Sequence, residues 1–264
     1  MDLTPPQSPD SDVAGRITYR LDLEYDGTRF SGWQIQDGER TVQGVIETVL
    51  ARLFSDSTRV SAAGRTDAGV HATGQVAHFR ALPHRSAETV RLALNANLPA
   101  DVRVKTVTIT DAAFHARFGA RWRAYRYRIA LEPLAMGRDY CWICPYRIEK
   151  LDEMQRAAEL ILGDHCFESF AHQNETEKHY LSTVYRSAWT KDGPYLDYRI
   201  EANRFLHGMV RLLVGTFIRV GRRKIGAGDV LEILNARDVR LAGPKAAASG
   251  LTLTAVGYEP WREP

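Results

Sequence analysis

One carboxylate in the chain has a setting that suits chemistry: Asp67, in the string G-R-T-D-A-G-V-H-A of residues 64–72. Gly64 and Gly69 flank it, and glycine can adopt backbone conformations that are closed to other residues. The adjacent Arg65 offers a fixed fork of donors that suits phosphate. A carboxylate held on such a turn is a candidate nucleophile, although an Asp in an Asp-x-Gly string is usually only a turn former. Other residues must decide between these interpretations.

Two groups of basic residues point to a polyanionic partner more clearly than the net charge of +3 does. In the first group, arginines are interleaved with aromatic residues, a mixture that suits phosphates and unstacked bases. A solvated basic strand face explains the same pattern equally well. The first group contains Arg117, Phe118, Arg121, Trp122, Arg123, Tyr125, Arg126, Tyr127 and Arg128, and the second contains Arg219, Arg222, Arg223 and Lys224.

Length and composition indicate an ordinary globular protein. The 264 residues fit one large domain or two of about 100–150 residues each, and 44% hydrophobic with 25% charged residues leaves enough material for a sizeable core. No uninterrupted apolar window reaches about 18 residues, so we expect no membrane span. Residues 1–15 are acidic and proline-rich and lack the pattern of a signal peptide. We therefore expect a disordered tail on a cytoplasmic protein.

The three cysteines, Cys141, Cys144 and Cys166, argue against a disulfide framework because their number is odd in a chain of this length. Cys141 and Cys144 have C-x-x-C spacing and His165 precedes Cys166, which leaves a zinc site or a redox pair open. No second closely spaced pair completes such a site. We expect neither a metal nor a cofactor.

The first half of the chain alternates strand and helix signals. Residues 17–25 alternate apolar with polar side chains, as in a half-buried strand that ends at Asp26-Gly27. Thr41 is suited to cap a helix with an apolar stripe from position 42 to 53. A strand at 76–79, a helix at 87–94 and a strand at 102–109 follow. This order is that of an α+β sandwich with helices on one sheet face.

The second half repeats the scheme without a detectable sequence repeat. We expect a strand at 125–131, a helix at 151–162 with Gly163 as its C-cap, a strand at 196–202, a long helix from 206 to 218, a short helix at 230–234 and a closing strand at 251–256. The prediction is an α+β fold of two similar halves, residues 16–112 and 113–264. They would share one mainly antiparallel sheet and leave a central cleft.

Several strings resemble those of the TruA-type tRNA pseudouridine synthases, in order and over nearly the whole chain. They are residues 25–27, 32–36, 64–72, 74–76, 95–99, 114–118, 123–127, 205–211 and 250–253. Ser182 departs from the pattern. Family members often have an arginine just before the Thr-Val of the strand that follows the second-domain loop, and here Ser182 stands before Thr183-Val184. Arg186 is a candidate to replace the missing arginine. The departure concerns a structural contact or a contact with the tRNA backbone, and it does not concern the chemistry. Residues 172–180 are also more polar and acidic than an RNA-facing loop should be.

The resemblance implies the pseudouridine synthase fold and an isomerase that converts uridine to pseudouridine at positions 38, 39 and 40 of the tRNA anticodon stem-loop. It implies tRNA as partner, a homodimer, and no metal or cofactor. It makes Asp67 the essential carboxylate and Arg211 its partner. The route stays open: attack on the sugar, attack on the uracil ring, or a glycal-forming elimination.

The resemblance also assigns the groups around the base. Tyr125 would stack on the freed uracil and assist proton removal, and Leu251 would pack against the flipped base. Arg65 would fill the gap or grip a phosphate when the uridine leaves its stack. His71 and Tyr127 are interpreted as structural residues.

Simpler interpretations remain beside these. Arg211 could be a helix-side arginine that reaches solvent, and Tyr125 one more core aromatic. Two other functions also compete: a non-catalytic RNA-binding module, which has no need for Asp67 and Arg211 together, and a glycosidic-bond hydrolase. A hydrolase would use Asp67 with a second carboxylate, such as Asp26, across one bond.

Overall fold

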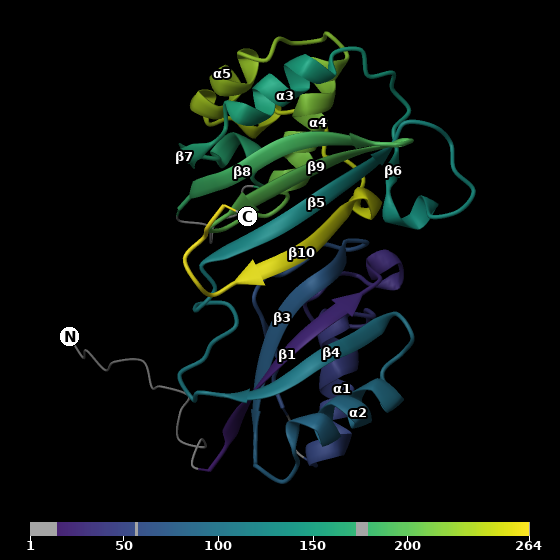
Figure 1. Cartoon of the computed structure of the whole chain (residues 1–264), viewed down its shortest axis with the longest axis vertical. Coiled ribbons are helices and arrows are strands. Elements are labelled where there is room, and N and C mark those ends of the chain that lie inside the picture. The colour runs from purple at the N-terminus through teal and green to yellow at the C-terminus, as the bar shows by residue number, and fades with distance from the viewer. Residues whose placement is uncertain (1–14, 56–57, 173–178, 264) are drawn as a thin grey trace, which may run out of the picture.

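The computed structural model describes residues 15–55, 58–172 and 179–263. Its central element is one large sheet with the strand order β4-β1-β3-β10-β5-β9-β8-β7 (Figure 1), and β2 and β6 pair with β3 and β5. In the described part of the chain every strand pairing is antiparallel except β10 with β3 and β5 with β6. The predicted α+β fold with a mainly antiparallel sheet is confirmed. The predicted tail falls, except for its last residue, outside the described residues.

The first half of the sheet follows the predicted order. Its elements are β1 (Ile17–Tyr25), α1 (Val42–Phe54), β2 (Ser61–Ala62), β3 (His71–Ala81), α2 (Ala87–Asn97) and β4 (Val102–Thr110). The hydroxyl of Thr41 accepts the N–H of Gly44 and caps α1. Tyr19, Leu21 and Leu23 of β1 are fully buried, because alternate strand residues face the helices.

The second half differs from its prediction in three additional strands and in the bounds of two helices. Its elements are β5 (Trp122–Ala130), β6 (Trp142–Ile143), α3 (Leu151–Glu159), β7 (Gly163–Cys166), β8 (Leu181–Asp192), β9 (Tyr195–Ala202), α4 (Met209–Gly221), α5 (Asp229–Ala236) and β10 (Leu251–Gly257). The hydrophobic pattern predicted none of β6, β7 and β8, and only the family resemblance implied a strand at residues 183–184. α3 ends before Gly163, which begins β7 instead of capping the helix. α4 begins at Met209 because Gly208 has a φ of +78°.

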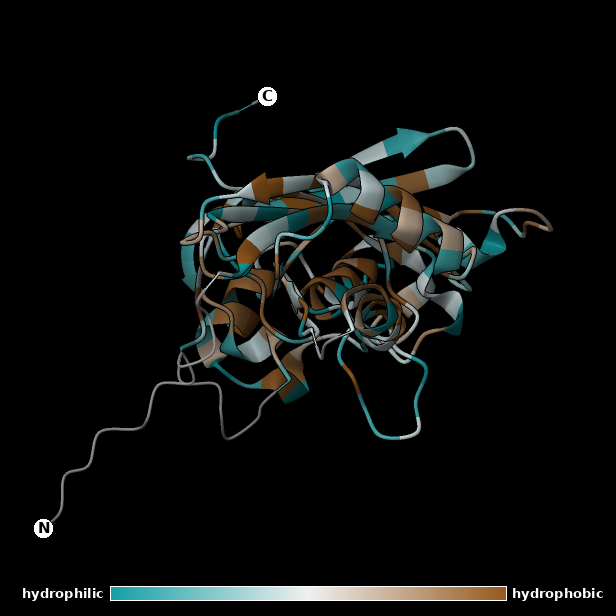
Figure 2. Cartoon of the chain, turned by 90° about the horizontal axis from the view of Figure 1, so that it is seen from below, coloured by the Kyte–Doolittle hydropathy of each residue, from teal (hydrophilic) through white to brown (hydrophobic). Residues whose placement is uncertain are grey.

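The closing strand β10 joins the two halves. It lies between β3 and β5, antiparallel to β5 and parallel to β3, with Thr252 opposite His71. The helices cover one face of the sheet (Figure 2). Buried apolar residues of β1 and β3 and of α1 and α4 belong to one core cluster. No helix in the described ranges is long and apolar enough to cross a membrane. Because β10 lies beside β3, it brings the last strand of the chain to the segment that precedes β3, where Asp67 lies.

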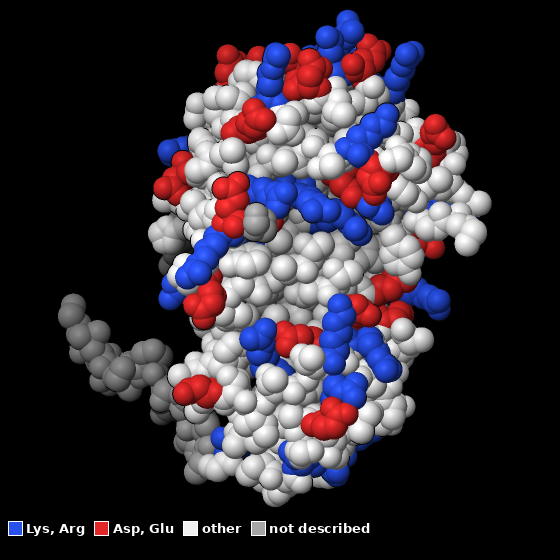
Figure 3. Space-filling view, in the orientation of Figure 1, with Lys and Arg blue, Asp and Glu red and all other residues white. Residues whose placement is uncertain are grey.

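The other face of the sheet carries charge, and around Val76 it is covered by the segment that contains Phe114 and Ala116. Figure 3 shows Lys and Arg side chains in a band across this face, over the second half of the sheet. In β5, Tyr125 and Tyr127 face the helices and are buried. Arg126 lies opposite Arg199 of the neighbouring strand β9, and Arg128 donates hydrogen bonds to Asp197. The predicted basic and aromatic stretch is thus divided between two faces, because strand side chains alternate.

Candidate active site

The segment that carries Asp67 connects β2 to β3 and is held from both sides. The carbonyl of Thr66 accepts the N–H of Trp33 at 3.0 Å, and its hydroxyl lies 2.8 Å from that of Tyr25. The amide of Gln75 donates to the carbonyl of Gly64 at 2.8 Å. Gly69 turns the chain with a φ of +75°, as its type allows, whereas Gly64 has no positive φ. The backbone next to Asp67 is therefore fixed before any substrate binds.

Three side chains from the second half of the chain surround the carboxylate of Asp67. Nη1 of Arg211 donates to Oδ2 at 2.9 Å, and Nζ of Lys245 lies 3.2 Å from the same oxygen. Nε2 of His207 lies 3.4 Å from Oδ1. Arg211 is 15% exposed and Asp67 23%, so the arginine does not reach out to bulk solvent. A partly buried arginine in this position needs the carboxylate, and the structure provides it.

These charges keep Asp67 ionised. Burial alone would raise the pKa of its carboxyl, but Lys245, His207 and Arg211 outweigh burial and hold the pKa of Asp67 below its ordinary value. Burial also lowers the pKa of His207, and Lys245, His172 and Arg211 act in the same direction against the opposing effect of Asp67. At neutral pH the site therefore presents a carboxylate anion.

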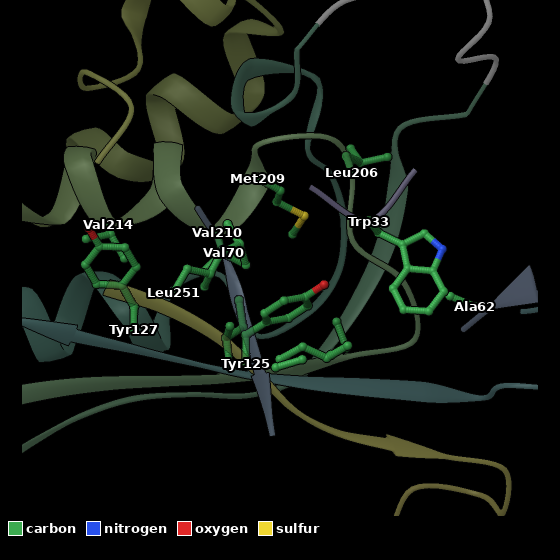
Figure 4. Packing of buried hydrophobic residues seen from close by; sticks show 14 of the residues in the cluster. Trp33, Ala62, Val70, Tyr125, Tyr127, Leu206, Met209, Val210, Val214 and Leu251 are labelled. Atoms are coloured by element: carbon green, nitrogen blue, oxygen red, sulfur yellow. The ribbon is translucent and has the colours of Figure 1, made fainter. Parts of the chain in front are cut away.

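Asp67 lies on the wall of a cleft of about 820 Å³ between the two halves. One side is lined by the segment around Asp67 and the other by residues 204–211 before and at the start of α4. Tyr125 and Leu251 lie in the floor, from neighbouring strands, and Figure 4 shows them below Met209 and Val210. A flat ring entering the cleft would contact apolar side chains and the carboxylate together.

The ring of Tyr125 is buried and meets that of Phe205 edge to face, with 4.9 Å between centroids. Burial, followed by the nearby Tyr25 and Asp67, raises the pKa of Tyr125. Its hydroxyl is therefore protonated at neutral pH and is a hydrogen-bond donor. To accept a proton during a reaction, it must give its own proton away at the same time.

Comparison with known proteins decides the family. A sequence model of tRNA pseudouridine synthases matches residues 23–119 and 157–259. The chain is 45% identical over 240 residues to the tRNA pseudouridine synthase A of Geobacillus kaustophilus, a match that covers 90% of this chain and 93% of that protein. The protein of the same name from Chloroflexus aurantiacus is 42% identical over 260 residues, covering 94% of this chain and 92% of its own. The chain belongs to the tRNA pseudouridine synthase family.

The residues that the resemblance singled out come together in this member of the family. Asp67, Arg211, Tyr125, Leu251 and Arg65 all line the one cleft, although they come from both halves of the chain. Their chemical roles stay predictions. The simpler interpretation of Arg211 fails on position, since Arg211 turns to a carboxylate rather than to solvent. Tyr125 is both a core aromatic and a cleft residue, because it belongs to the core cluster and also lines the cleft.

Sequence reasoning missed Lys245 and His207. His207 lies inside the string of residues 205–211, so its place in that string was an available signal. Lys245 stands in a segment of small residues before β10 and carries no motif. Only the packing of that segment on α4 shows that its ammonium group reaches Asp67.

The basic and aromatic stretch contributes to the cleft only in part. Arg123 donates to the carbonyl oxygens of Ala63, Arg117, Ala120 and Asn203 and ties segments together. Arg117 and Phe118 lie at the rim of the cleft. The ring of Phe118 is 79% exposed and stacks on His115 with 4.3 Å between centroids.

The second basic group lies away from the cleft. It lies at the far end of α4: Arg219 is in the last turn, about 12 Å along the helix axis from Arg211 at the usual rise per residue, and the other three residues follow the helix. Arg222 lies over the ring of Tyr146, and Arg223 pairs with Glu149.

Other singled-out residues have structural positions. Ser182 is buried and its hydroxyl donates to the carbonyl of Arg204 at 2.7 Å, while Arg186 lies 3.6 Å from Glu201. The ring of buried His71 lies 3.1 Å from the N–H of Gly27. Most of the loop at 172–180 lies outside the described residues.

The cysteines form no disulfide, and no group of three or more metal-ligating side chains occurs in the described part of the chain. Asp26, the second carboxylate of the hydrolase hypothesis, accepts hydrogen bonds from Thr28 and from the hydroxyl of Tyr140. It does not line the cleft, where Asp67 is the single carboxylate among the described residues.

Proposed function

We propose that this protein isomerises uridine to pseudouridine in tRNA, at positions 38, 39 and 40 of the anticodon stem-loop, with Asp67 as the essential carboxylate. One observation carries the proposal: an ionised carboxylate, paired with an arginine, faces a cleft floored by an aromatic ring in a chain of this family. The reaction breaks the bond between C1′ of the ribose and N1 of uracil and forms a bond from C1′ to C5. N1 gains a proton and C5 loses one.

The cleft supplies a group for each requirement of that reaction. Asp67 attacks C1′, attacks the uracil ring or supports a glycal-forming elimination, and each route needs it ionised. Tyr125 and Leu251 hold the detached base so that it turns without leaving. Rotation of the base exposes C5 to C1′, and we assign the proton exchange to the hydroxyl of Tyr125, which lines the cleft.

The rim of the cleft suits an RNA strand. Arg65, Arg117 and Arg204 bring positive charge to it, as the phosphates that flank a flipped nucleotide require. The exposed ring of Phe118, pinned on His115, offers its free face to an unstacked base. A groove that only bound RNA would gain nothing from an anion such as Asp67, which repels phosphates.

One variant and one labelled substrate test the proposal. Wild-type protein is incubated with tRNA carrying tritium at C5 of uridine, and tritium release is compared with base release. An isomerase releases tritium and keeps the base attached, a hydrolase frees uracil, and a binding module does neither. Asp67→Asn should bind the same tRNA and form no pseudouridine, because an amide is neither an anion nor a nucleophile at neutral pH. Pseudouridine formation by Asp67→Asn at a rate near that of wild type would refute the assignment.

We also propose that the protein works as a homodimer, in which one subunit binds the tRNA body while the cleft of the other takes the target uridine. A net charge of +3 is small for a long polyanion, and a second copy doubles it. Sedimentation velocity at micromolar concentration should show a dimer. A monomer with full activity would contradict this proposal.

A further inference from the structure

Lys245 places a second permanent positive charge on the carboxylate that Arg211 already binds. Its Nζ lies 3.2 Å from Oδ2 of Asp67, and Nη1 of Arg211 lies 2.9 Å from the same atom. The other carboxylate oxygen, Oδ1, has His207 as its neighbour at 3.4 Å. The two oxygens of Asp67 are therefore unequal: one receives both permanent cations, and the other faces a half-exposed imidazole.

The backbone, rather than a flexible surface chain, determines where Lys245 lies. Residues 242–247 form a strap that runs along α4. The N–H of Gly243 donates to the hydroxyl of Thr216 at 2.7 Å, and the N–H of Ala246 donates to the carbonyl of Arg211 at 3.1 Å. Nε of Arg211 donates back to the carbonyl of Ala246 at 2.7 Å. Arg211 thus binds the strap with one side of its guanidinium and Asp67 with the other.

This arrangement links the two cations. The same arginine that holds Oδ2 also holds the residue next to Lys245, so strap, helix and carboxylate form one hydrogen-bonded unit. A carboxylate with two charged donors on one oxygen cannot rotate about its terminal bond without losing both. Its remaining oxygen stays beside His207, which also lines the cleft.

We propose that Lys245 is a positioning residue for the proposed isomerisation: together with Arg211 it holds Oδ2 of Asp67, and it thereby leaves Oδ1 as the oxygen that reacts. The inference rests on the proposed function and adds which oxygen acts and which residue selects it. Lys245 also keeps the carboxylate ionised, because an opposite charge within about 4–6 Å favours the anion by about 1–3 pKa units. His207, beside Oδ1, is the group whose ionisation reports the local charge.

The test compares Lys245→Met, which keeps an unbranched stem and loses the charge, with Lys245→Arg, which keeps the charge. Lys191→Met is the matched control, since Lys191 is exposed at the end of β8 and its loss also removes one positive charge. Single-turnover rates at saturating enzyme and dissociation constants are measured with an anticodon stem-loop RNA from pH 4.5 to 7.5. The His207 ring is titrated by NMR in each variant, with His207→Gln to assign its signal.

For Lys245→Met we expect a saturated rate about tenfold below wild type, an RNA dissociation constant within about twofold, and a deficit that grows about twofold on acidification. The groups that face His207 are Asp67, Lys245, Arg211 and His172. Loss of the Lys245 charge should therefore raise the pKa of His207. Lys245→Arg should recover most of the rate, and Lys191→Met should match wild type.

Three results would overturn the inference. An equal rate loss at every pH with an unmoved His207 would make Lys245 a structural residue. A loss of RNA affinity with an unchanged saturated rate would make it a phosphate contact. A wild-type rate would give it no role. None of these touches the proposed function, which fails only if the wild-type protein itself makes no pseudouridine.

Discussion

Replacing Arg211 with methionine removes the guanidinium group that joins the carboxylate to the strap and keeps a stem of similar bulk. Two charge-assisted hydrogen bonds are lost: one to Oδ2 of Asp67 at 2.9 Å and one to the carbonyl of Ala246 at 2.7 Å. The carboxylate keeps Lys245, but the strap that positions Lys245 loses one of its anchors. Arg211→Met should therefore reduce activity, because Asp67 loses one of the groups that hold it and Lys245 loses part of its support.

The magnitude follows from the exposure of the pair. A hydrogen bond to a charged group contributes about 1.5–3 kcal/mol, and breaking a fully buried ion pair costs about 3–5 kcal/mol. Asp67 is 23% exposed and Arg211 15%, so water moderates the loss. We take about 2 kcal/mol, which is about a thirtyfold slower chemical step at about 1.4 kcal/mol per tenfold.

The assay is the single-turnover formation of pseudouridine at saturating enzyme, with thermal unfolding measured in parallel. Arg156→Met is the control, because Arg156 is an exposed arginine of α3 that pairs with Glu153. The control should retain the wild-type rate. Arg211→Met within threefold of wild type, with the fold intact, would refute the role of the pair in holding Asp67.

Three further outcomes follow from the structure. Tyr125→Phe keeps the ring contacts and should bind RNA normally but react about a hundredfold more slowly if its hydroxyl transfers a proton; an unchanged rate would limit Tyr125 to stacking. Phe118→Leu should weaken RNA binding at least about fivefold, the lower end of one stacked base, without changing the saturated rate, and equal dissociation constants would contradict this. Burial, followed by His115, lowers the pKa of His78 from 6.5 to about 4. Between these two pH values His78 is protonated in the unfolded chain and neutral in the folded chain. The stability that neutral His78 contributes is therefore complete above about pH 6.5 and falls as the pH drops toward 4. Between pH 7 and pH 5 the urea midpoint should fall less in His78→Gln than in wild type or in the exposed control His84→Gln. An equal fall of the midpoint in all three proteins would refute the assignment.

The elements with strong local signals were predicted well. β1 and α1 have an unbroken alternation and an apolar stripe with a capping threonine, and both occur with the predicted bounds. β8 was missed because its inward positions include Ser182 and Ser187, and a bulge between Val184 and Arg186 interrupts its period. Pairing with β9 stabilises this strand, and such pairing is invisible in a single segment.

The Asp67 string and its family were readable because they depend on residue types at short spacing, and the likeness to the family named Arg211, Tyr125 and Leu251 as well. For the basic and aromatic stretch the sequence left two interpretations equal, and the alternation of β5 separates Tyr125 from Arg126 onto opposite faces.

By itself the sequence determined the fold class, the local elements and the identity of the central carboxylate, since each is carried by neighbouring residues and their period. Only the tertiary structure decided what surrounds that carboxylate. Lys245 lies 178 residues after Asp67, on a strap with no motif, and meets it because hydrogen bonds fasten the strap to α4 while β10 is inserted between β3 and β5. A contact of this kind is decided by the packing of whole elements, and the charge around Asp67 depends on it.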